Sequence, residues 1–252
     1  MDAVMIAAFL FLAGLLVGSF LTVVAHRVPR GESVVGGRSH CPACGAQIAA
    51  YDNVPVLSWL LLRGRARCCG ATISPRYPLT ELALGLLYAA NGLAFHDDVP
   101  QLLLGLVFVS TLLAVTLTDL ERRIIPNKIL LTAAVLGVAI TAIGDPGSLP
   151  ERAIAAAAAG GLLLAAALAY PRGMGLGDVK LAATMGLFLG RDVAPAILVA
   201  LVVGSLVGLT MIAREGAAAR KRAIPFGPFL ALGGLVGLFA GDEMVDWYLG
   251  TF

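Results

Sequence analysis

Residues 101–119 read QLLLGLVFVSTLLAVTLTD, an uncharged and mostly apolar run that ends in an aspartate. A helix that crosses the roughly 30 Å hydrocarbon core of a bilayer needs about 20 predominantly apolar residues. The stretch therefore predicts a membrane span. Because an ionisable group at membrane depth is costly, the aspartate at its end, Asp119, is a candidate functional residue.

The whole chain has the same character. Of its 252 residues, 59% are hydrophobic and 13% are charged, and the mean hydropathy is +0.89. A soluble domain has about 45–50% apolar and about 25% charged residues. The composition excludes an ordinary cytosolic globule, a disordered chain, a collagen-like repeat and a disulfide-stapled secreted domain. We expect an all-α polytopic membrane protein.

Eight apolar segments predict about eight transmembrane helices. The segments are 3–24, 79–95, 101–118, 128–144, 152–170, 179–190, 194–213 and 226–241. The first begins Met-Asp, without a basic region, and has no small-residue cleavage site before Arg27, which favours a retained anchor over a signal peptide. We expect an anchor helix at 1–25, a small polar lobe at 26–78 and a seven-helix membrane core at 79–252.

The positions of the basic residues predict the orientation of these spans. All but two of the 18 lysines and arginines lie in the intervals that follow the first, third, fifth and seventh spans, and the exceptions are Arg152 and Arg191. The other intervals hold mainly acidic residues. Since cytoplasmic loops retain the positive charge, the lobe at 26–78 is predicted to be cytoplasmic and both termini are predicted to face outside.

Two aspartates stand at corresponding ends of their spans. Asp178 closes the stretch Gly-Met-Gly-Leu-Gly-Asp and precedes the span at 179–190. Because this span and the one before Asp119 run in opposite directions, both carboxylates are predicted at the cytoplasmic face. Two carboxylates within hydrogen-bonding distance share a proton, so one acts as base on a water and the other as acid toward a carbonyl. Gly175 and Gly177 lack a Cβ and allow a substrate backbone to approach. This pattern is typical of an aspartic protease.

Other interpretations of these residues stay open. Asp178 also fits an N-cap of its helix, and Asp119 fits a boundary residue paired with Arg122 or Arg123. A transporter would use Asp119, Asp178 and Glu81 as ion or proton sites, although such sites usually lie near the midplane on broken helices. A third interpretation is a non-enzymatic assembly protein that docks through its cysteine-containing lobe, in which case neutralising either aspartate would leave function intact.

All four cysteines lie in the predicted cytoplasmic lobe. Cytoplasmic thiols are normally kept reduced, so a metal is favoured over disulfides. Cys41-Pro-Ala-Cys44 has the spacing that places two thiolates on one tetrahedral zinc, and Cys68 and Cys69 could complete the site. Adjacent residues do not chelate one ion as readily, however. The alternatives are three cysteines with His40 or another ligand, or no metal at all.

Six blocks of sequence, in order along nearly the whole chain, resemble the signatures of the type IV prepilin peptidases, which are membrane aspartic peptidases of the GxGD type. The blocks are 18–29 (GSFLTVVAHRVP), 41–45 (CPACG), 73–81 (ISPRYPLTE), Asp119 with 125–127 (IPN), 175–181 (GLGDVKL) and 225–229 (PFGPF).

The resemblance implies a polytopic endopeptidase of the bacterial inner membrane. Such an enzyme removes the short basic leader from type IV prepilins and pseudopilins at the cytoplasmic membrane face. Carried over position by position, Asp119 and Asp178 match the catalytic pair, and Gly175, Gly177 and Lys180 belong to the active-site loop. The implied partners are these precursors and the lipid bilayer, with no nucleic acid.

The resemblance also implies a second activity. Family members with a cysteine lobe commonly methylate the new N-terminal amine with S-adenosylmethionine. No Gly-x-Gly-x-x-Gly fingerprint follows a strand in this sequence, so nothing in the residues identifies a cofactor pocket. Glu81 is a candidate for one, and pairing with Arg76 is the alternative. The displaced cysteine pair and Thr22, where the family more often has asparagine, depart from the pattern, so a peptidase without methyltransferase activity is the alternative function.

Overall fold

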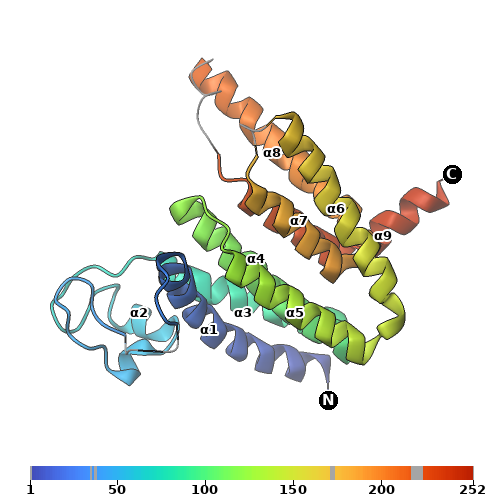
Figure 1. Cartoon of the computed structure of the whole chain (residues 1–252). Helices are drawn as coiled ribbons and strands as arrows, with labels where there is room; N and C mark the ends of the chain where they lie inside the picture. Colours follow the sequence, from blue (N-terminus) through green and yellow to red (C-terminus); the bar gives the residue numbers. More distant parts are fainter. Residues whose placement is uncertain (1, 35, 37–38, 171–173, 217–223, 252) are drawn as a thin grey trace. The chain divides into compact units, whose positions relative to one another are not determined.

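A computed structural model describes residues 2–34, 36, 39–170, 174–216 and 224–251. The described part of the chain is helical, with two isolated β-bridges and no strand. It divides into two compact units, Met1–Asp97 and Asp98–Phe252, shown in Figure 1. The all-α architecture expected from the sequence is therefore confirmed.

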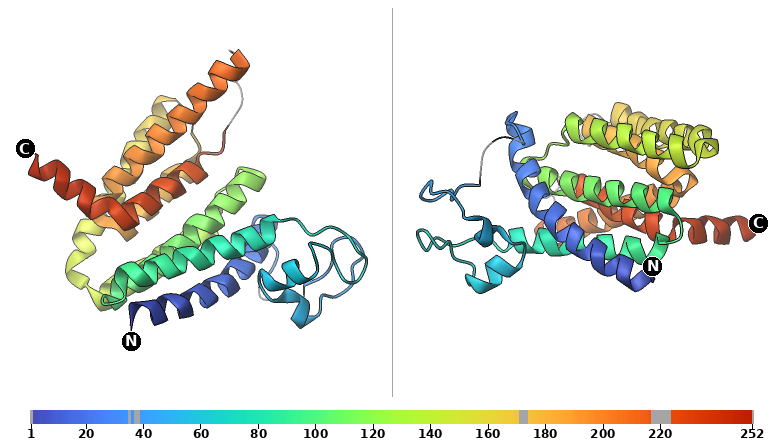
Figure 2. Two further views of the ribbon diagram at one scale, coloured as in Figure 1. Left: turned by 180° about the vertical axis from the view of Figure 1, so that it is seen from behind. Right: turned by 90° about the horizontal axis from the view of Figure 1, so that it is seen from below.

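The first unit pairs two long helices, α1 (Ala3–Arg27) and α3 (Arg76–Phe95), which lie side by side in Figure 2. Close packing holds them together, because a Cβ on Gly14 would lie 2.7 Å from the Leu84 carbonyl oxygen and one on Gly18 would lie 2.8 Å from the Glu81 Cα. Small residues at four-residue spacing allow such backbone approach.

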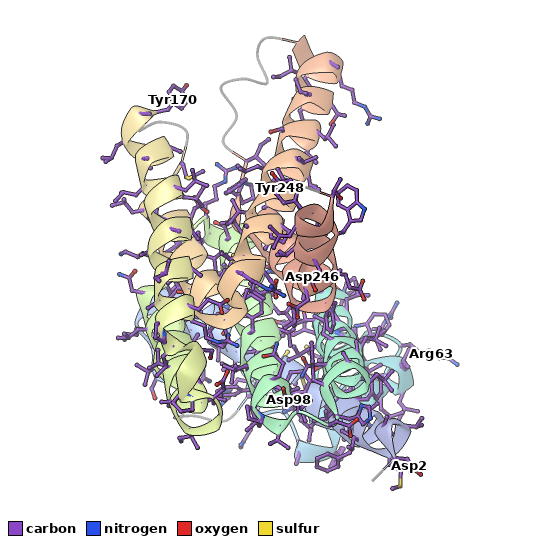
Figure 3. The ribbon with its side chains drawn as sticks, turned by 90° about the vertical axis from the view of Figure 1, so that its right-hand side faces the viewer. Asp2, Arg63, Asp98, Tyr170, Asp246 and Tyr248 are labelled. Carbon is purple, nitrogen blue, oxygen red and sulfur yellow. The ribbon has the colours of Figure 1, made fainter. Side chains whose placement is uncertain are left out.

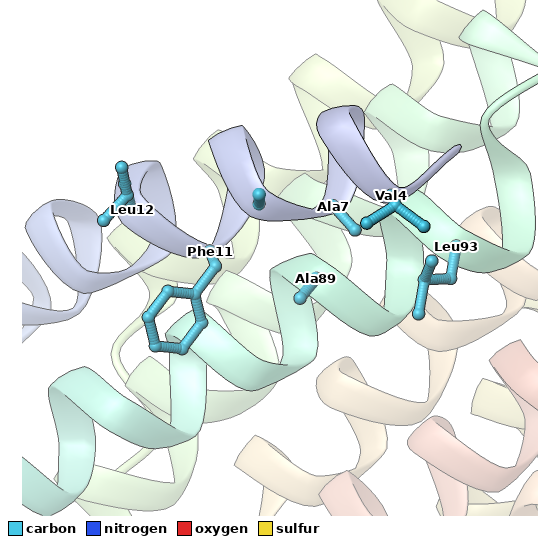
Figure 4. Close-up of a pocket in the computed structure, with 7 residues that line it drawn as sticks. Val4, Ala7, Phe11, Leu12, Ala89 and Leu93 are labelled. Carbon is cyan, nitrogen blue, oxygen red and sulfur yellow. The ribbon is translucent and has the colours of Figure 1, made fainter. Parts of the chain in front are cut away.

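An open apolar hollow lies along this pair of helices (Figure 4). It is lined by Val4, Ala7, Ala8, Phe11, Leu12, Ala89 and Leu93. The lining carries no charged side chain, as expected for a surface of a membrane protein that faces lipid chains.

The chain between α1 and α3 forms the lobe. It contains the 3-10 helices η1 (Val28–Arg30) and η2 (Ala50–Asn53) and the short helix α2 (Leu57–Leu61). Among the described residues between 28 and 75, Cys41 is the only buried hydrophobic side chain. A segment of this size without an apolar core needs another source of stability, such as a metal or disulfides.

The second unit is a bundle of six long helices joined by short connections. They are α4 (Val99–Arg122), α5 (Asn127–Gly144), α6 (Leu149–Ala169), α7 (Leu176–Leu189), α8 (Val193–Glu215) and α9 (Gly227–Gly250), with the 3-10 helices η3 (Pro146–Ser148) and η4 (Gly190–Asp192). Helix α6 packs along α7, and α8 along α9. The rings of Phe108 on α4 and Phe188 on α7 stack at 5.1 Å between centroids, and both side chains are fully buried. This contact joins the two helices that carry Asp119 and Asp178.

Each of the eight predicted segments contains a helix, but the count of eight membrane spans is not confirmed. Six stretches of the described chain are long and apolar enough to cross a membrane: Ala3–Arg30, Val99–Arg122, Asn127–Gly144, Pro146–Ala169, Leu176–Glu215 and Gly227–Gly250. Helices α7 and α8 form one of these stretches together. Helix α3 is not among them, because polar residues such as Glu81 and Asn91, both buried within the first unit, lower its hydropathy. The chain is a multi-pass membrane protein.

Two boundaries differ from the expectation. The sequence assigned 79–252 to one core, whereas α3 groups with α1 in the first unit. The last span was expected to end at residue 241, where the apolar run stops, whereas α9 continues to Gly250. Arg191 explains the extension, since its Nη2 donates to Asp242 Oδ1 at 2.9 Å and to Asp246 Oδ1 at 3.2 Å.

The two sets of helix ends in the second unit differ in charge. Arg122, Arg123, Lys128 and Lys180 lie where α4 ends and α5 and α7 begin, whereas Asp98, Asp145, Glu151 and Asp192 lie at the opposite helix ends. In Figure 3, Tyr170 at the end of α6 and Asp98 before α4 mark these opposite ends. Five of the basic residues used for the orientation, Arg38, Arg172, Arg220, Lys221 and Arg222, lie outside the described residues.

Candidate active site

Asp119 lies in the last turn of α4 and is 5% exposed. Its Oδ2 accepts a hydrogen bond of 2.9 Å from the backbone N–H of Gly227, the first residue of α9. A Cβ at position 227 would lie 2.7 Å from this oxygen, so only glycine brings the start of α9 so close to the carboxylate. The N-terminus of a helix favours negative charge, which suits a carboxylate at this position.

Asp178 is the third residue of α7, and it is buried. Its Oδ2 accepts from the Gly175 N–H at 3.1 Å, while its own N–H donates to the Gly175 carbonyl oxygen at 3.1 Å. The carboxylate thus plays the reciprocal part of a capping box. Asp178 stands at position N3, and Gly175 takes the N-cap position that the capping interpretation gave to the aspartate.

The charge of Asp119 acts electrostatically on Asp178. Two further contacts join the chain segments that carry them. Gly177 lies against the residue after α4, because a Cβ at 177 would be 3.0 Å from the Ile125 Cβ. On the next turn of α7, Lys180 Nζ donates to Asn127 Oδ1 at 3.0 Å. The predicted loop residues therefore surround Asp178 and connect it to the segment that follows Asp119.

One oxygen of each aspartate remains available. Within the described part of the chain, neither Asp119 Oδ1 nor Asp178 Oδ1 accepts a hydrogen bond, and no lysine or arginine there forms an ion pair with either carboxylate. No ion pair joins Asp119 to Arg122 or Arg123 among the described residues, but the charge of Arg123 acts electrostatically on Asp119. Two buried carboxylates that come within hydrogen-bonding distance can share a proton and hold a water between their available oxygens.

The four cysteines come together in the lobe. All four Sγ atoms lie within 4.8 Å of one another, and three of the separations are 3.6 Å (Cys41 to Cys69), 3.4 Å (Cys44 to Cys68) and 3.9 Å (Cys68 to Cys69). A tetrahedral zinc with Zn–S bonds of about 2.3 Å requires sulfur atoms roughly 3.8 Å apart. The residues therefore fit a single zinc. The adjacency of Cys68 and Cys69 does not prevent the approach, and His40 is not part of the cluster.

The local backbone prepares one of these thiols for metal binding. Hydrogen bonds from the backbone N–H groups of Ala43 and Cys44 lower the pKa of Cys41 to about 6, whereas the contact with the Cys44 thiol raises the pKa of Cys68 to about 12. The thiolate is the form that binds metals. Cys41 is also the buried member of the cluster, whereas the other three are exposed.

Glu81 has a structural partner. Its side chain is buried on α3, and Oε2 accepts from the Val56 N–H at 2.7 Å. Val56 has φ 60° and ψ −51°, a conformation that a β-branched residue rarely adopts. Glu81 thus holds a strained turn of the lobe against α3, and one carboxylate oxygen is already engaged.

Sequence reasoning missed the role of Gly227. The motif at 225–229 was quoted in the resemblance, but no function was attached to it. Only packing over a long sequence separation places its backbone N–H on Asp119. The two prolines around Phe226-Gly227 were the available signal, because proline at the first positions of a helix marks a helix start and hence a group of free N–H donors.

Comparison with known proteins agrees with these findings. Residues 12–95 match the model of the bacterial peptidase A24 N-terminal domain, and residues 106–212 match the model of the type IV leader peptidase family. The two matches fall within the first and the second unit, respectively. No solved structure matches the chain significantly.

Several curated relatives are each named prepilin leader peptidase/N-methyltransferase. The protein of Stutzerimonas stutzeri is 37% identical over 94% of this chain and 91% of its own length. The protein of Bacillus subtilis is 34% identical over 95% of this chain and 96% of its own length. The protein of Myxococcus xanthus is 39% identical over 84% of this chain and 65% of its own length. On these matches, the chain belongs to the type IV leader peptidase family.

Proposed function

We propose that this protein is an aspartic endopeptidase that removes the basic leader from type IV prepilins or pseudopilins, and then methylates the new N-terminus with S-adenosylmethionine. The observation that carries the peptidase proposal is the pair Asp119 and Asp178. Each carboxylate is buried, is fixed by one glycine N–H and keeps one oxygen available. Family membership and the names of the relatives support both activities.

The proposed mechanism uses the pair with one shared proton. The ionised carboxylate takes a proton from a water as the water oxygen bonds to the scissile carbonyl carbon, and the protonated partner gives its proton to the carbonyl oxygen. The tetrahedral intermediate then collapses, the C–N bond breaks, and the proton taken from water passes to the leaving amine. The hydroxyl proton returns to the carboxylate that donated first. Because the two groups titrate as a pair, the roles of acid and base belong to the dyad.

The surroundings of the pair suit a substrate with a basic leader and an apolar helix. We place the active site at the cytoplasmic face, because the helix ends that carry Asp119 and Asp178 also carry the basic residues. A precursor with its leader inside and its helix in the bilayer presents the scissile junction at this depth. Lys180 would then act by holding the loop, since its ammonium is bound to Asn127.

We assign zinc to the lobe as a structural ion, held by Cys41, Cys44, Cys68 and Cys69. It would supply the cross-link that a segment with so few buried apolar side chains lacks. S-adenosylmethionine would supply the methyl group for the new amine. Glu81, the candidate residue for its pocket, already accepts a hydrogen bond from the lobe backbone.

The test is cleavage of a prepilin-like membrane peptide by the full chain in detergent, with labelled S-adenosylmethionine present. Asp119→Asn and Asp178→Asn should each reduce cleavage by about 10²–10⁴-fold or more, since each removes a proton-transfer group. Asp145→Asn, a carboxylate at the opposite helix ends, is the matched control and should cleave normally. Retained cleavage in either of the first two variants would remove that residue from the mechanism. Cleavage without transfer of the labelled methyl group would support the proposed peptidase activity and contradict the proposed methyltransferase activity.

A further inference from the structure

Two loops of the lobe share one backbone design, with a constant offset of 25 residues. The first loop is 41–45 (CPACG) and the second is 66–70 (ARCCG). In each loop the N–H of the first residue donates to the carbonyl of the residue five positions later, and the glycine N–H donates back to the first carbonyl. All four bonds are 2.8 Å: Cys41 to Ala46, Gly45 to Cys41, Ala66 to Ala71 and Gly70 to Ala66.

The flanking structure repeats as well. Each loop is closed by an antiparallel bridge, His40 with Gln47 and Arg65 with Thr72, and both pairs keep the offset of 25. The closing glycines, Gly45 and Gly70, both have φ +71°. The two loops are therefore equivalent residue by residue, although only the first contains the spacing Cys-x-x-Cys.

This equivalence identifies an exchanged ligand. Cys44 corresponds to Cys69, but Cys41 corresponds to Ala66, so the second loop lacks a thiol at its first position. Cys68 corresponds to Ala43, a position without a thiol in the first loop. Nevertheless, the Cys68 Sγ lies 3.4 Å from that of Cys44 and 3.9 Å from that of Cys69, within the range that one tetrahedral zinc requires.

We propose that Cys68 supplies the fourth thiolate, which the equivalence of the two loops would place at residue 66. A thiol at residue 66 in place of Cys68 should then give a symmetric four-thiolate site. This inference rests on the proposed zinc. It has a consequence for the ion. Cys41 is buried at 4% exposure, whereas Cys68 is exposed, so the exchanged thiolate is more accessible to water and to chelators than its counterpart in the first loop. Zinc should leave this site faster than it would leave a site with both loops of the Cys-x-x-Cys type.

The test uses the full chain in detergent as wild type, Cys68→Ala, and the exchange variant Ala66→Cys/Cys68→Ala. Bound zinc per chain is measured, and Co²⁺ is then loaded as a probe, because its visible spectrum distinguishes four thiolate ligands from three. Cys68→Ala should lose the four-thiolate spectrum, and the exchange variant should regain it and release zinc to a chelator more slowly than wild type does. Ala43→Cys, which adds a thiol at the matching position of the first loop, should leave the wild-type spectrum unchanged.

The outcomes are distinguishable. Wild-type protein without bound zinc or a cobalt spectrum overturns the zinc proposal itself and the ligand exchange with it. A wild type that binds metal, together with a four-thiolate spectrum in Cys68→Ala, overturns only the exchange. An exchange variant that fails to regain the four-thiolate spectrum, whether it folds or not, also overturns only the exchange. If the two loops are equivalent, a thiol at residue 66 must replace the one at residue 68.

Discussion

The carboxylate pair and the cysteine cluster are built in opposite ways. Asp119 is fixed by a residue 108 positions away in sequence, and the helices that carry the pair are joined by the buried stack of Phe108 on Phe188. The cysteines sit on two short loops whose backbone bonds span at most five residues. The bundle therefore positions its site through packing, whereas the lobe positions its site through local hydrogen bonds and, in our proposal, through the metal.

The lobe has other local contacts of the same kind. Arg67 donates to both oxygens of Asp52, with bonds of 2.9 and 2.8 Å, and its guanidinium lies over the Tyr51 ring. Trp59 Nε1 donates to the Ile73 carbonyl oxygen at 3.0 Å. The Arg67 side chain is 59% exposed, and an ion pair with an exposed partner stabilises a fold by only about 0–1 kcal/mol. The comparison predicts that packing changes damage the bundle site and that metal removal damages the lobe.

Among changes that leave both carboxylates in place, the largest effect is expected from Gly227→Ala. The added Cβ would lie 2.7 Å from Asp119 Oδ2 and 3.2 Å from the Asp119 Cβ, so the N–H donor and the carboxylate must separate. A displacement of about 1 Å at a catalytic group costs on the order of 10²-fold in rate, and we expect a loss of that size in peptide cleavage. Gly208→Ala is the matched control, because nothing lies within 4 Å of a Cβ there. Normal cleavage by Gly227→Ala would show that this hydrogen bond does not position Asp119.

Metal removal should have the next largest effect, and it should be confined to the lobe. A zinc chelator, or Cys41→Ser with Cys44→Ser, should expose residues 39–74 to a protease while the helices of the second unit stay protected. Cleavage of the prepilin peptide should fall by roughly tenfold or less and should not be lost, since the carboxylates lie in the other unit. Complete loss of cleavage, with the helices intact, would mean that the metal acts in the peptidase reaction.

Breaking the link between Lys180 and Asn127 should reduce cleavage moderately. Lys180→Met removes the bond that joins the first turns of α7 to the start of α5, and we expect a loss of roughly 3- to 10-fold. Asn127→Ala should cause a similar loss, and the double variant should lose little more than either single variant because both remove the same contact. Fully additive losses would indicate that Lys180 acts on the substrate directly.

The sequence predicts the helical segments, and it predicts that the two aspartates lie at the same end of their helices. Each prediction depends on a pattern that can be read along single segments. Hydropathy marks each span, and the basic residues mark which helix ends belong together. The Gly227 bond to Asp119 depends on packing between distant segments, so no local pattern encodes it. Helix α3, expected as a span at 79–95, is not among the six stretches apolar enough to cross a membrane, since Glu81 and Asn91 lower its hydropathy although both side chains are buried within the first unit.

The cysteine cluster shows the same limit within a short segment. Judged by their adjacency in the chain alone, Cys68 and Cys69 were expected to bind one ion less readily than a Cys-x-x-Cys pair. The backbone bonds from Ala66 to Ala71 and from Gly70 to Ala66 fold the second loop back on itself. This turn brings both thiols to the pair from the first loop. The same bonds were not predictable at 66–70, since the usual marker, a first-position cysteine, is absent there.

The smallest effect is expected from Arg191→Ala, which tests whether the extension of α9 depends on its ion pairs. The guanidinium is about half exposed and bonds to Asp242 and Asp246, which are themselves mostly exposed, so screening by water limits the contribution to about 1 kcal/mol. Hydrogen exchange should become faster at residues 242–250, and cleavage should not change, because these contacts lie at the helix ends opposite Asp119. Arg191→Lys is the control that keeps the charge but loses the forked geometry, and it should give an intermediate rate of exchange. If exchange at 242–250 stays at the wild-type rate in Arg191→Ala, the helix persists beyond the apolar run on its intrinsic propensity alone, and the explanation given for the difference at residue 241 is wrong.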